Sequence, residues 1–252
     1  MGAIDEHSNH GPAAVLRCLN HVSTGRLIAV MLINRPYFDA VCWDWNGTLL
    51  DDVGVARVAM NEVLQTHQLP TIADEDEYRQ LFGFPIRSFY SRVGVGEGAF
   101  VEAANQYLRL FAQTVGQASL QHEARATLAA IGALGVEQVL ISATPKEVLK
   151  QQLAPHALNA HFSEILGITD VYAASKAHVV ASWLESSGHN PQRVLMVGDT
   201  NHDEEIAEAL NVRFLRYSRG HQESQSQGPH PVVDNLRDVV TFLGQSARSN
   251  LA

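Results

Sequence analysis

Cysteine is scarce in this chain, which has only Cys18 and Cys42 among its 252 residues. Small secreted folds that depend on disulfides are much richer in cysteine, and Cys42 falls inside an apolar run that predicts a buried strand. We therefore expect no disulfide framework, and the cysteine content favours a reducing, cytoplasmic setting.

Positive charge is also scarce, because 18 Lys and Arg face 27 Asp and Glu and give a formal net charge of −9. An acidic balance of this kind argues against a nucleic-acid-binding protein and against an anionic membrane surface. We expect a small molecule as the partner and no nucleic acid or membrane. Both a monomer and a homodimer are compatible with the sequence.

Long hydrophobic runs are absent near the start, where the longest apolar stretch, Leu27 to Ile33, is too short to span a bilayer. Asp5 and Glu6 do not suit the basic start of a signal peptide. We expect residues 1–36 to be an N-terminal extension, which is either flexible or an upstream start that adds little to the fold.

From residue 38 onward, short runs rich in Val, Ile and Leu alternate with helical patterns, which is typical of βα units and a parallel sheet. Strands are predicted at 38–43, 137–142, 193–197 and 212–216, with a weaker one at 164–167. Helices are predicted at 121–133, 145–153, 175–188, 201–210 and 235–244. The expected fold class is a doubly wound, Rossmann-like α/β domain, built from residues 37–52 and 121–252.

The segment 53–120 interrupts the alternation, because it has no convincing strand and predicts helices at 55–67, 74–81, 86–93 and 97–117. Asp51 and Asp52 can cap the first of these helices. A segment inserted directly after the first strand would lie over the carboxyl ends of the sheet, where open α/β sheets bind ligands. We expect it to be an α-helical cap domain.

An aspartate ends the first predicted strand, in the run Asp44-Trp45-Asn46-Gly47-Thr48-Leu49. A carboxylate at this edge of a sheet can coordinate a metal or attack phosphorus, and the glycine lets the backbone turn closely around a bound group. An aspartate before such a turn is often only a turn residue, so this run needs support from other parts of the chain.

Three later motifs lie at or just after predicted strand ends of the same sheet. The Ser142 hydroxyl and the Ala143 backbone amide precede a helix and suit a phosphate oxygen. Lys176 is a point charge that can neutralise a phosphate. Asp199 and Asp203, four residues apart after a hydrophobic strand, suit a site of oxygen ligands for Mg²⁺.

Together, the four motifs resemble the haloacid dehalogenase-like superfamily, in the family's order and over residues 38 to about 244. The resemblance implies a magnesium-dependent phosphohydrolase that acts on a small phosphorylated metabolite. It also implies a helical cap of the family's first type, placed between motifs one and two, as in phosphoglycolate-phosphatase-like members.

The resemblance also implies a role for each matching residue. Asp44 corresponds to the nucleophile that forms an aspartyl-phosphate, and the Asn46 position lends its backbone carbonyl to the metal. Asp199 corresponds to the main acidic metal ligand and Asp203 to a supporting acid.

Four further positions match the family pattern, Ser142 and Lys176 as catalytic residues and Thr48 and Ala143 as substrate-binding residues. Thr48 corresponds to the threonine of motif one, and Ser142 with Ala143 to the phosphate-binding hydroxyl and its neighbour. Lys176 corresponds to the phosphate-orienting lysine.

Asn46 departs from the family, because most phosphatases of this kind have an aspartate there that serves as general acid and then as base. An amide cannot transfer protons, and general acid–base catalysis contributes about 10² to 10⁴ in rate. Four explanations stand: a slower phosphatase that prefers good leaving groups, a replacement acid such as His202 or a cap residue, a non-catalytic phosphate-binding pseudoenzyme, or a deliberate Asp-to-Asn change.

Two other chemistries of the family fit the sequence poorly. Phosphonoacetaldehyde hydrolases need a lysine in the cap, whereas the lysines here are Lys146, Lys150 and Lys176. Haloacid dehalogenases usually replace the acidic Gly-Asp pair of motif four, whereas this chain keeps Gly198-Asp199.

Arg87 is the candidate for reading an anionic substrate from the cap, because its stretch resembles the part of the cap that faces the active site in phosphoglycolate-phosphatase-like members. A guanidinium can bind a carboxylate or phosphate with two hydrogen bonds. His202 lies between Asp199 and Asp203 in sequence and is a candidate ligand or acid. His221, in the loop after the strand 212–216, is a weaker candidate.

Overall fold

A parallel sheet of six strands, in the order β5-β4-β1-β6-β7-β8, organises the computed structural model. The structure describes residues 36–168, 175–223 and 228–249. The predicted N-terminal extension, apart from Pro36, lies outside the described residues, and so does Cys18. Cys42 is a free, buried thiol in β1. Among the described helices, none is long and apolar enough to cross a membrane.

The strands of this sheet are β1 Ala40–Trp43, β4 Glu137–Pro145, β5 Glu164–Ile168, β6 Val194–Gly198, β7 Arg213–Tyr217 and β8 Val232–Val233. The short strands β2 Leu50–Asp51 and β3 Ser119–Leu120 form a separate antiparallel pair. The helices are α2 Val53–Thr66, α3 Glu75–Leu81, α4 Ile86–Arg92, α5 Phe100–Thr114, α6 Ala124–Ala133, α7 Lys146–Leu153, α8 Lys176–Ser187, α9 Asn201–Ala209 and α10 Arg237–Ser249. The 3₁₀ turns are η1 Glu97–Ala99, η2 Val115–Gln117, η3 Ala154–His156, η4 Asn159–His161 and η5 Pro191–Arg193.

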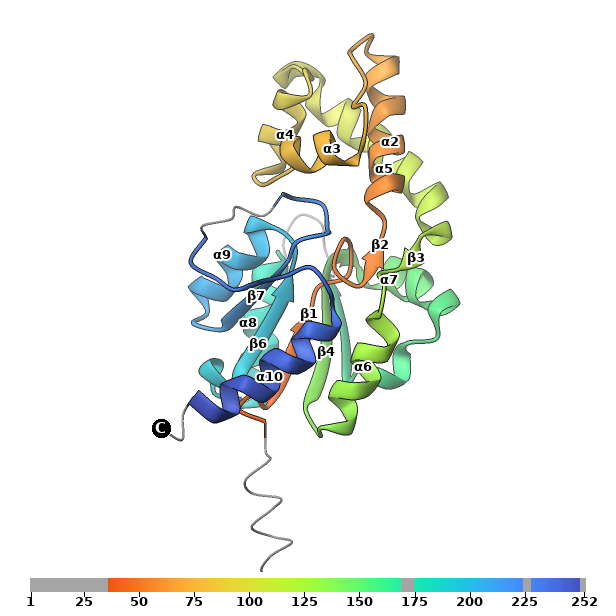
Figure 1. Cartoon of the computed structure of the whole chain (residues 1–252). Coiled ribbons are helices and arrows are strands. Elements are labelled where there is room, and N and C mark those ends of the chain that lie inside the picture. Colours follow the sequence, from red (N-terminus) through yellow and green to blue (C-terminus); the bar gives the residue numbers. More distant parts are fainter. Residues whose placement is uncertain (1–35, 169–174, 224–227, 250–252) are drawn as a thin grey trace, which may run out of the picture. The chain divides into compact units, whose positions relative to one another are not determined.

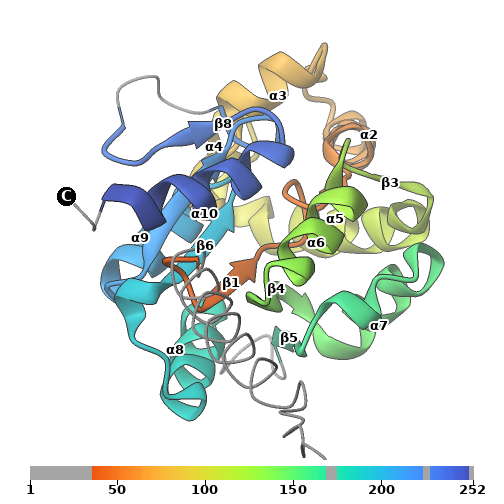
Figure 2. The ribbon, with the colours of Figure 1, turned by 60° about the horizontal axis from the view of Figure 1, so that its bottom comes forward.

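Helices cover both faces of the sheet because alternate residues of each strand point to opposite sides. From β1, Val41 and Trp43 pack into a cluster with residues of α6, α7 and α10. Ala40 and Cys42 pack into a second cluster with α8 and α9. Figure 2 shows α6 and α10 on one side of the strands and α8 on the other. The expected doubly wound α/β class is confirmed.

All five predicted strands are present, and each predicted helix of the sheet-forming part is found within a few residues of its expected bounds. The prediction of no strand within 53–120 is wrong at its end, because β3 pairs there with β2. A strand of two residues is too short to show an alternating pattern, and the same reason explains why β8 was not predicted.

The helices between β2 and β3 form a helical insertion, residues 53–117, which has its own buried cluster that includes Met60, Tyr78 and Phe89. Leu50 pairs with Leu120 and Asp51 with Ser119, so the two ends of the insertion lie side by side. Figure 1 shows α2 to α5 together beyond β2 and β3, away from the six-stranded sheet.

The expectation that Asp52 caps the first helix of the insertion is wrong. Asp52 occupies the N-cap position of α2, but its side chain makes no capping hydrogen bond. Instead, the carboxylate is turned toward the loop after β1 and accepts hydrogen bonds there.

Candidate active site

Three residues from separate elements meet at the carboxyl ends of β1 and β6. Asp44 directly follows β1, Lys176 is the first residue of α8, and Asp203 lies in the first turn of α9. The Lys176 ammonium donates to Asp44 Oδ1 and, over 2.5 Å, to Asp203 Oδ1. All three side chains are buried. The lysine therefore bridges the predicted nucleophile and a predicted metal ligand.

Asp199 follows β6 and completes a cluster of carboxylates. One ligand oxygen from each of Asp44, Asp199 and Asp203 lies within 4.8 Å of the others. Asp199 Oδ1 accepts from the Thr48 hydroxyl over 2.9 Å, and Oδ2 accepts from the His221 backbone amide over 2.6 Å. These two bonds fix the orientation of a carboxylate that has no exposed surface.

Two glycines leave the space that Asp199 occupies. A Cβ atom on Gly47 would lie 2.4 Å from Asp199 Oδ2, and one on Gly220 would lie 2.2 Å from the same oxygen. Gly47 also has a φ of +78°, which favours glycine. The loops after β1 and β7 can approach Asp199 this closely only because both positions lack a side chain.

Asp203 is held by the start of its own helix. Thr200 and Asp203 form a capping box, in which the Thr200 hydroxyl and backbone amide both donate to Asp203 Oδ2, over 2.7 and 3.1 Å. Such a box satisfies the free amides of a helix start. The other oxygen, Oδ1, is left for Lys176.

Burial and charge shift the pKa values of these groups in different directions. Burial raises the pKa of Asp44 and that of Asp199, although Lys176 opposes the shift at Asp44 and His221 opposes it at Asp199. At Asp203 burial would raise the pKa, but the Lys176 charge, together with the hydrogen bonds from Lys176 and Thr200, outweighs it and lowers the pKa. At Lys176, burial would lower the pKa, but the two carboxylates outweigh it and raise the pKa, so the ammonium is retained.

The charge balance of the site fits a divalent cation. The described side chains bring four buried carboxylates, those of Asp44, Asp52, Asp199 and Asp203, next to two cationic groups, Lys176 and His221. Burying this many carboxylates is costly, and a divalent cation beside them would favour their charged forms. Carboxylate and carbonyl oxygens are also the ligands that Mg²⁺ prefers.

The Asn46 side chain is bound at both ends. Its Nδ2 donates to Asp52 Oδ2 over 2.8 Å, and its Oδ1 accepts from the Thr144 hydroxyl over 3.1 Å. The Gly47 backbone amide donates to the other Asp52 oxygen over 2.7 Å. The loop that holds the predicted nucleophile is thus fixed by Asp52, which the sequence pattern had indicated only as a helix cap.

His221 is a second residue whose position the sequence did not predict. Its Nε2 lies 3.1 Å from Asp52 Oδ1, and its Nδ1 lies 3.1 Å from the Tyr78 hydroxyl of α3. Burial alone would lower the pKa of His221, but the charge and hydrogen bond of Asp52, together with the charges of Asp199 and Asp44, outweigh it and raise the pKa to about 9. The only signal in the sequence was its place after a strand, at the edge where the other motifs gather.

The predicted phosphate-binding pair lies in β4, next to β1. Trp43 pairs with Leu140, so Ser142 stands two residues further along the neighbouring strand. Its buried hydroxyl accepts from the Thr144 backbone amide over 3.0 Å, and Ala143 between them is exposed.

The last two candidates have other contacts in this structure. Arg87 in α4 pairs with Glu97, and its guanidinium lies 4.1 Å from the centroid of the Phe100 ring, within the helical insertion. The ring of His202 stacks on Phe84 with 4.8 Å between centroids, and burial lowers its pKa. Neither residue has a described hydrogen bond or ion pair to Asp44.

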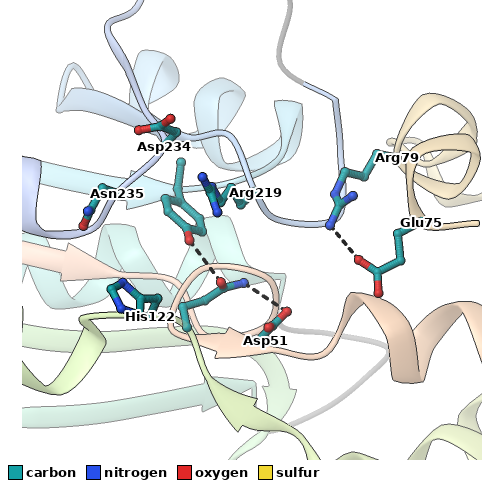
Figure 3. Close-up of a pocket in the computed structure, with 9 residues that line it drawn as sticks. Asp51, Glu75, Arg79, His122, Arg219, Asp234 and Asn235 are labelled. Atoms are coloured by element: carbon teal, nitrogen blue, oxygen red, sulfur yellow. Dashed lines mark hydrogen bonds and ion pairs between the residues drawn. The ribbon is translucent and has the colours of Figure 1, made fainter.

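A cavity of about 450 Å³ lies beside this site, on the side of β2 and β3. Its lining comes from α3, from β2, from the end of β7, and from the segments after β3, after β7 and before α10. It consists of Asp51, Glu75, Arg79, Gln121, His122, Tyr217, Arg219, Asp234 and Asn235. The Tyr217 hydroxyl donates to Gln121 Oε1 over 3.0 Å. Figure 3 shows Arg79 facing Glu75. None of the residues predicted for catalysis or metal binding lines this cavity.

Comparisons with known proteins identify the family of this chain. A family model described as "Haloacid dehalogenase-like hydrolase" matches residues 41–217. The chain is 26% identical over 220 residues to phosphoglycolate phosphatase 1 of Pseudomonas aeruginosa, covering 82% of this chain and 80% of that protein. It is 25% identical over 222 residues to phosphoglycolate phosphatase of Pectobacterium atrosepticum, covering 83% and 94%. Its fold is similar to that of a haloacid dehalogenase-like family protein from Streptococcus pneumoniae, with a TM-score of 0.71, 18% identity, and coverage of 82% and 98%.

Proposed function

The chain belongs to the haloacid dehalogenase-like hydrolases, and from that premise we propose that it hydrolyses a small phosphomonoester with Mg²⁺, through an aspartyl-phosphate on Asp44. The observation that carries this proposal is the buried cluster in which Lys176 bridges Asp44 and Asp203. The relatives named phosphoglycolate phosphatases make phosphoglycolate the first substrate to test.

In the proposed first step, an oxygen of Asp44 forms a bond to phosphorus while the bond between phosphorus and the leaving oxygen breaks. The Lys176 charge, already against Asp44, stabilises the negative charge that develops on the phosphoryl group. The Ser142 hydroxyl and the Ala143 amide bind phosphoryl oxygens. Water then attacks phosphorus, the bond to Asp44 breaks, and phosphate leaves.

Mg²⁺ would be held by the Asp44 and Asp199 carboxylates and the Asn46 backbone carbonyl, with Asp203 in support. It supplies neutralisation of the negative charge on the transferred phosphoryl group. Thr48 contributes by fixing Asp199 through its hydroxyl.

Asn46 sets the expected substrate preference. Because its amide cannot donate a proton to the leaving oxygen, alkyl phosphates lose a factor of about 10² to 10⁴ unless another group supplies the proton. Esters with good leaving groups, such as para-nitrophenyl phosphate, do not need that proton and are expected to react faster.

We further propose that the helical insertion is the cap of a domain formed by residues 37–52 and 121–252. Closure of such a cap excludes bulk water and selects the substrate. Arg87 remains the proposed reader of an anionic substrate group, which requires it to leave Glu97 when substrate binds.

The direct test is a panel of phosphorylated metabolites, led by phosphoglycolate, assayed with and without MgCl₂. We expect phosphate release that depends on Mg²⁺, an acid-labile phosphoenzyme in rapid quench, and loss of both in Asp44→Asn. A wild-type protein that forms no phosphoenzyme and releases no phosphate from the whole panel would refute the proposal.

A pseudoenzyme that binds phosphate without turnover is the second candidate, and the engagement of Asn46 at both ends of its amide favours it. Calorimetry separates the two. Binding of inorganic phosphate in the presence of Mg²⁺, together with zero turnover of the panel, is the pattern expected of the pseudoenzyme.

A further inference from the structure

The loop between α3 and α4 of the helical insertion contacts the first turn of α9. Asn201, the first residue of α9, accepts a hydrogen bond from the Phe84 backbone amide through Oδ1, over 3.1 Å. Its Nδ2 donates to the Phe84 carbonyl over 3.2 Å. One side-chain amide therefore pairs with both backbone groups of one residue, as a neighbouring strand would.

A third contact selects the orientation of the Asn201 amide. Glu205, one turn further along α9, accepts from Asn201 Nδ2 over 2.9 Å. A carboxylate only accepts, so it requires the NH₂ group of the amide on its side. With the NH₂ group placed there, the carbonyl oxygen of the amide is the atom left to face the Phe84 amide.

Neighbouring residues support the same contact. His202 stacks its ring on Phe84 at 28° between ring planes. The Asn201 backbone amide donates to Gln222 Oε1 over 2.6 Å, which ties the start of α9 to the loop after β7. Arg79 of α3 donates to the Gly220 carbonyl of that loop over 3.0 Å.

The contact between Asn201 and Phe84 lies in the same first turn of α9 as Asp203, which belongs to the carboxylate cluster. Asn201 stands between Thr200 and Asp203, the two residues of the capping box, and follows Asp199 by two positions. Any movement that breaks the bonds to Phe84 occurs next to the side chains that hold Asp203.

We propose that Asn201 is a positioning residue that fastens the helical insertion to the start of α9, through paired hydrogen bonds to the Phe84 backbone, and so holds the insertion over the bound substrate. The claim that the insertion is held over the bound substrate rests on the proposed phosphohydrolase function. The claim that Asn201 fastens the insertion to α9 rests on the contacts alone and is tested separately.

The chain contains a matched control. Asn61 of α2 makes the same paired bonds to a backbone, because Nδ2 donates to the Ile72 carbonyl over 2.9 Å and Oδ1 accepts from the Ile72 amide over 2.8 Å. Both of its partners lie within the helical insertion. Asn61→Ala therefore removes equivalent bonds without touching the contact between the insertion and α9.

The experiment compares Asn201→Ala and Asn61→Ala with the wild-type chain by hydrogen exchange and mass spectrometry on peptides spanning residues 81–86. Loss of two net hydrogen bonds is expected to raise exchange in this segment of Asn201→Ala by about tenfold, with wild-type exchange there in Asn61→Ala. Equal exchange in the two variants would show that Asn201 does not fasten the insertion.

The second readout is steady-state kinetics with para-nitrophenyl phosphate and phosphoglycolate. For the better substrate, Asn201→Ala is expected to raise KM about tenfold and to lower kcat by less than about threefold, because binding in the closed state is lost while Asp44 and Lys176 are kept. Asn61→Ala is expected to keep the wild-type KM. An unchanged KM in Asn201→Ala contradicts the role in substrate binding, and if the wild-type chain has no turnover, hydrogen exchange still decides the positional role.

Discussion

At the scale of single residues, Asn46 and Asp52 form a donor–acceptor pair, in which a change of one partner alone leaves the other without its match. Asp52 is fully buried and accepts from the Asn46 amide and the Gly47 backbone amide. The Asn46 Nδ2 atom lies 2.8 Å from Asp52 Oδ2. An aspartate at position 46 would put a carboxylate oxygen in the place of that nitrogen, directly against the Asp52 carboxylate. Like charges this close cannot both be ionised at low cost.

Asn46→Asp is therefore expected to lower the free energy of unfolding by about 1 to 3 kcal/mol. Exchanging the partners, with Asn46→Asp and Asp52→Asn together, restores one donor and one acceptor and is expected to recover most of the loss. Urea denaturation of the two variants and the wild-type chain measures both effects.

The double variant also tests whether the wild-type chain lacks a general acid for the leaving oxygen. It places a carboxyl group two residues after Asp44 without the opposing charge, so turnover of an alkyl phosphate is expected to rise by about 10² to 10⁴ if proton transfer limits the wild-type enzyme. A double variant that is no more stable than Asn46→Asp would contradict the pairing itself.

At the scale of elements, the first turn of α9 both begins a helix and holds a predicted metal ligand. The Thr200 hydroxyl caps the helix and donates to Asp203 Oδ2 over 2.7 Å. The helix start and the orientation of this carboxylate therefore depend on the same side chain.

Thr200→Ala is expected to lower the free energy of unfolding by about 1 kcal/mol, through loss of the cap, and to weaken Mg²⁺ binding about tenfold, because Asp203 Oδ2 loses the hydroxyl that helps to orient it. Urea denaturation measures the first effect and calorimetric titration with MgCl₂ the second.

Asp74→Ala is the control for this comparison. Asp74 caps α3 by accepting from the Glu77 amide over 2.9 Å, within the helical insertion. It is expected to show a similar loss of stability with wild-type Mg²⁺ affinity. The link between cap and ligand fails if both variants bind Mg²⁺ equally well.

Elements with long buried runs could be predicted from the sequence, and the rest could not. The runs that form β1, β4 and β6 are buried on both faces, so their hydrophobicity alone marked them. Strands β2, β3 and β8 have two residues each, and their pairing depends on where the chain returns in three dimensions.

The same limit explains the site residues that were missed. Asp44, Lys176 and Asp199 were recognisable because each stands at a strand end or helix start within a local motif. The contact between His221 and Asp52 joins residues 169 positions apart, so no local sequence pattern could predict it. Asp52 stands directly before a predicted helix, so the sequence indicated a helix cap. The direction of its side chain is set by the loop after β1, which the local sequence does not show.

At the scale of the whole molecule, Cys42 reports on the integrity of the sheet. It lies in β1, which is paired with β4 on one side and β6 on the other. Burial raises the pKa of its thiol well above the usual range, Glu137 adds to the shift, and Lys176 opposes it less strongly. The thiolate is the reactive form, so raising the pH from about 7 to 9 is not expected to make Cys42 reactive in the folded protein.

Labelling with N-ethylmaleimide along a urea series, followed by mass spectrometry of the peptide that contains Cys42, measures this. Modification is expected only along the global unfolding transition, at both pH values, because exposing β1 requires both of its neighbours to separate. Rapid labelling at pH 9 without urea would mean that the centre of the sheet opens locally.

The pairing of β2 with β3 has a consequence for the evolution of the chain. Because Leu50 and Leu120 are paired, the polypeptide leaves the α/β domain and returns to it at a single place. A recombination event at that place can exchange the intervening module for one of another length or shape, while the order of the six strands is inherited unchanged. If the insertion selects the substrate, as proposed above, substrate choice and chemistry can then diverge at different rates within one lineage.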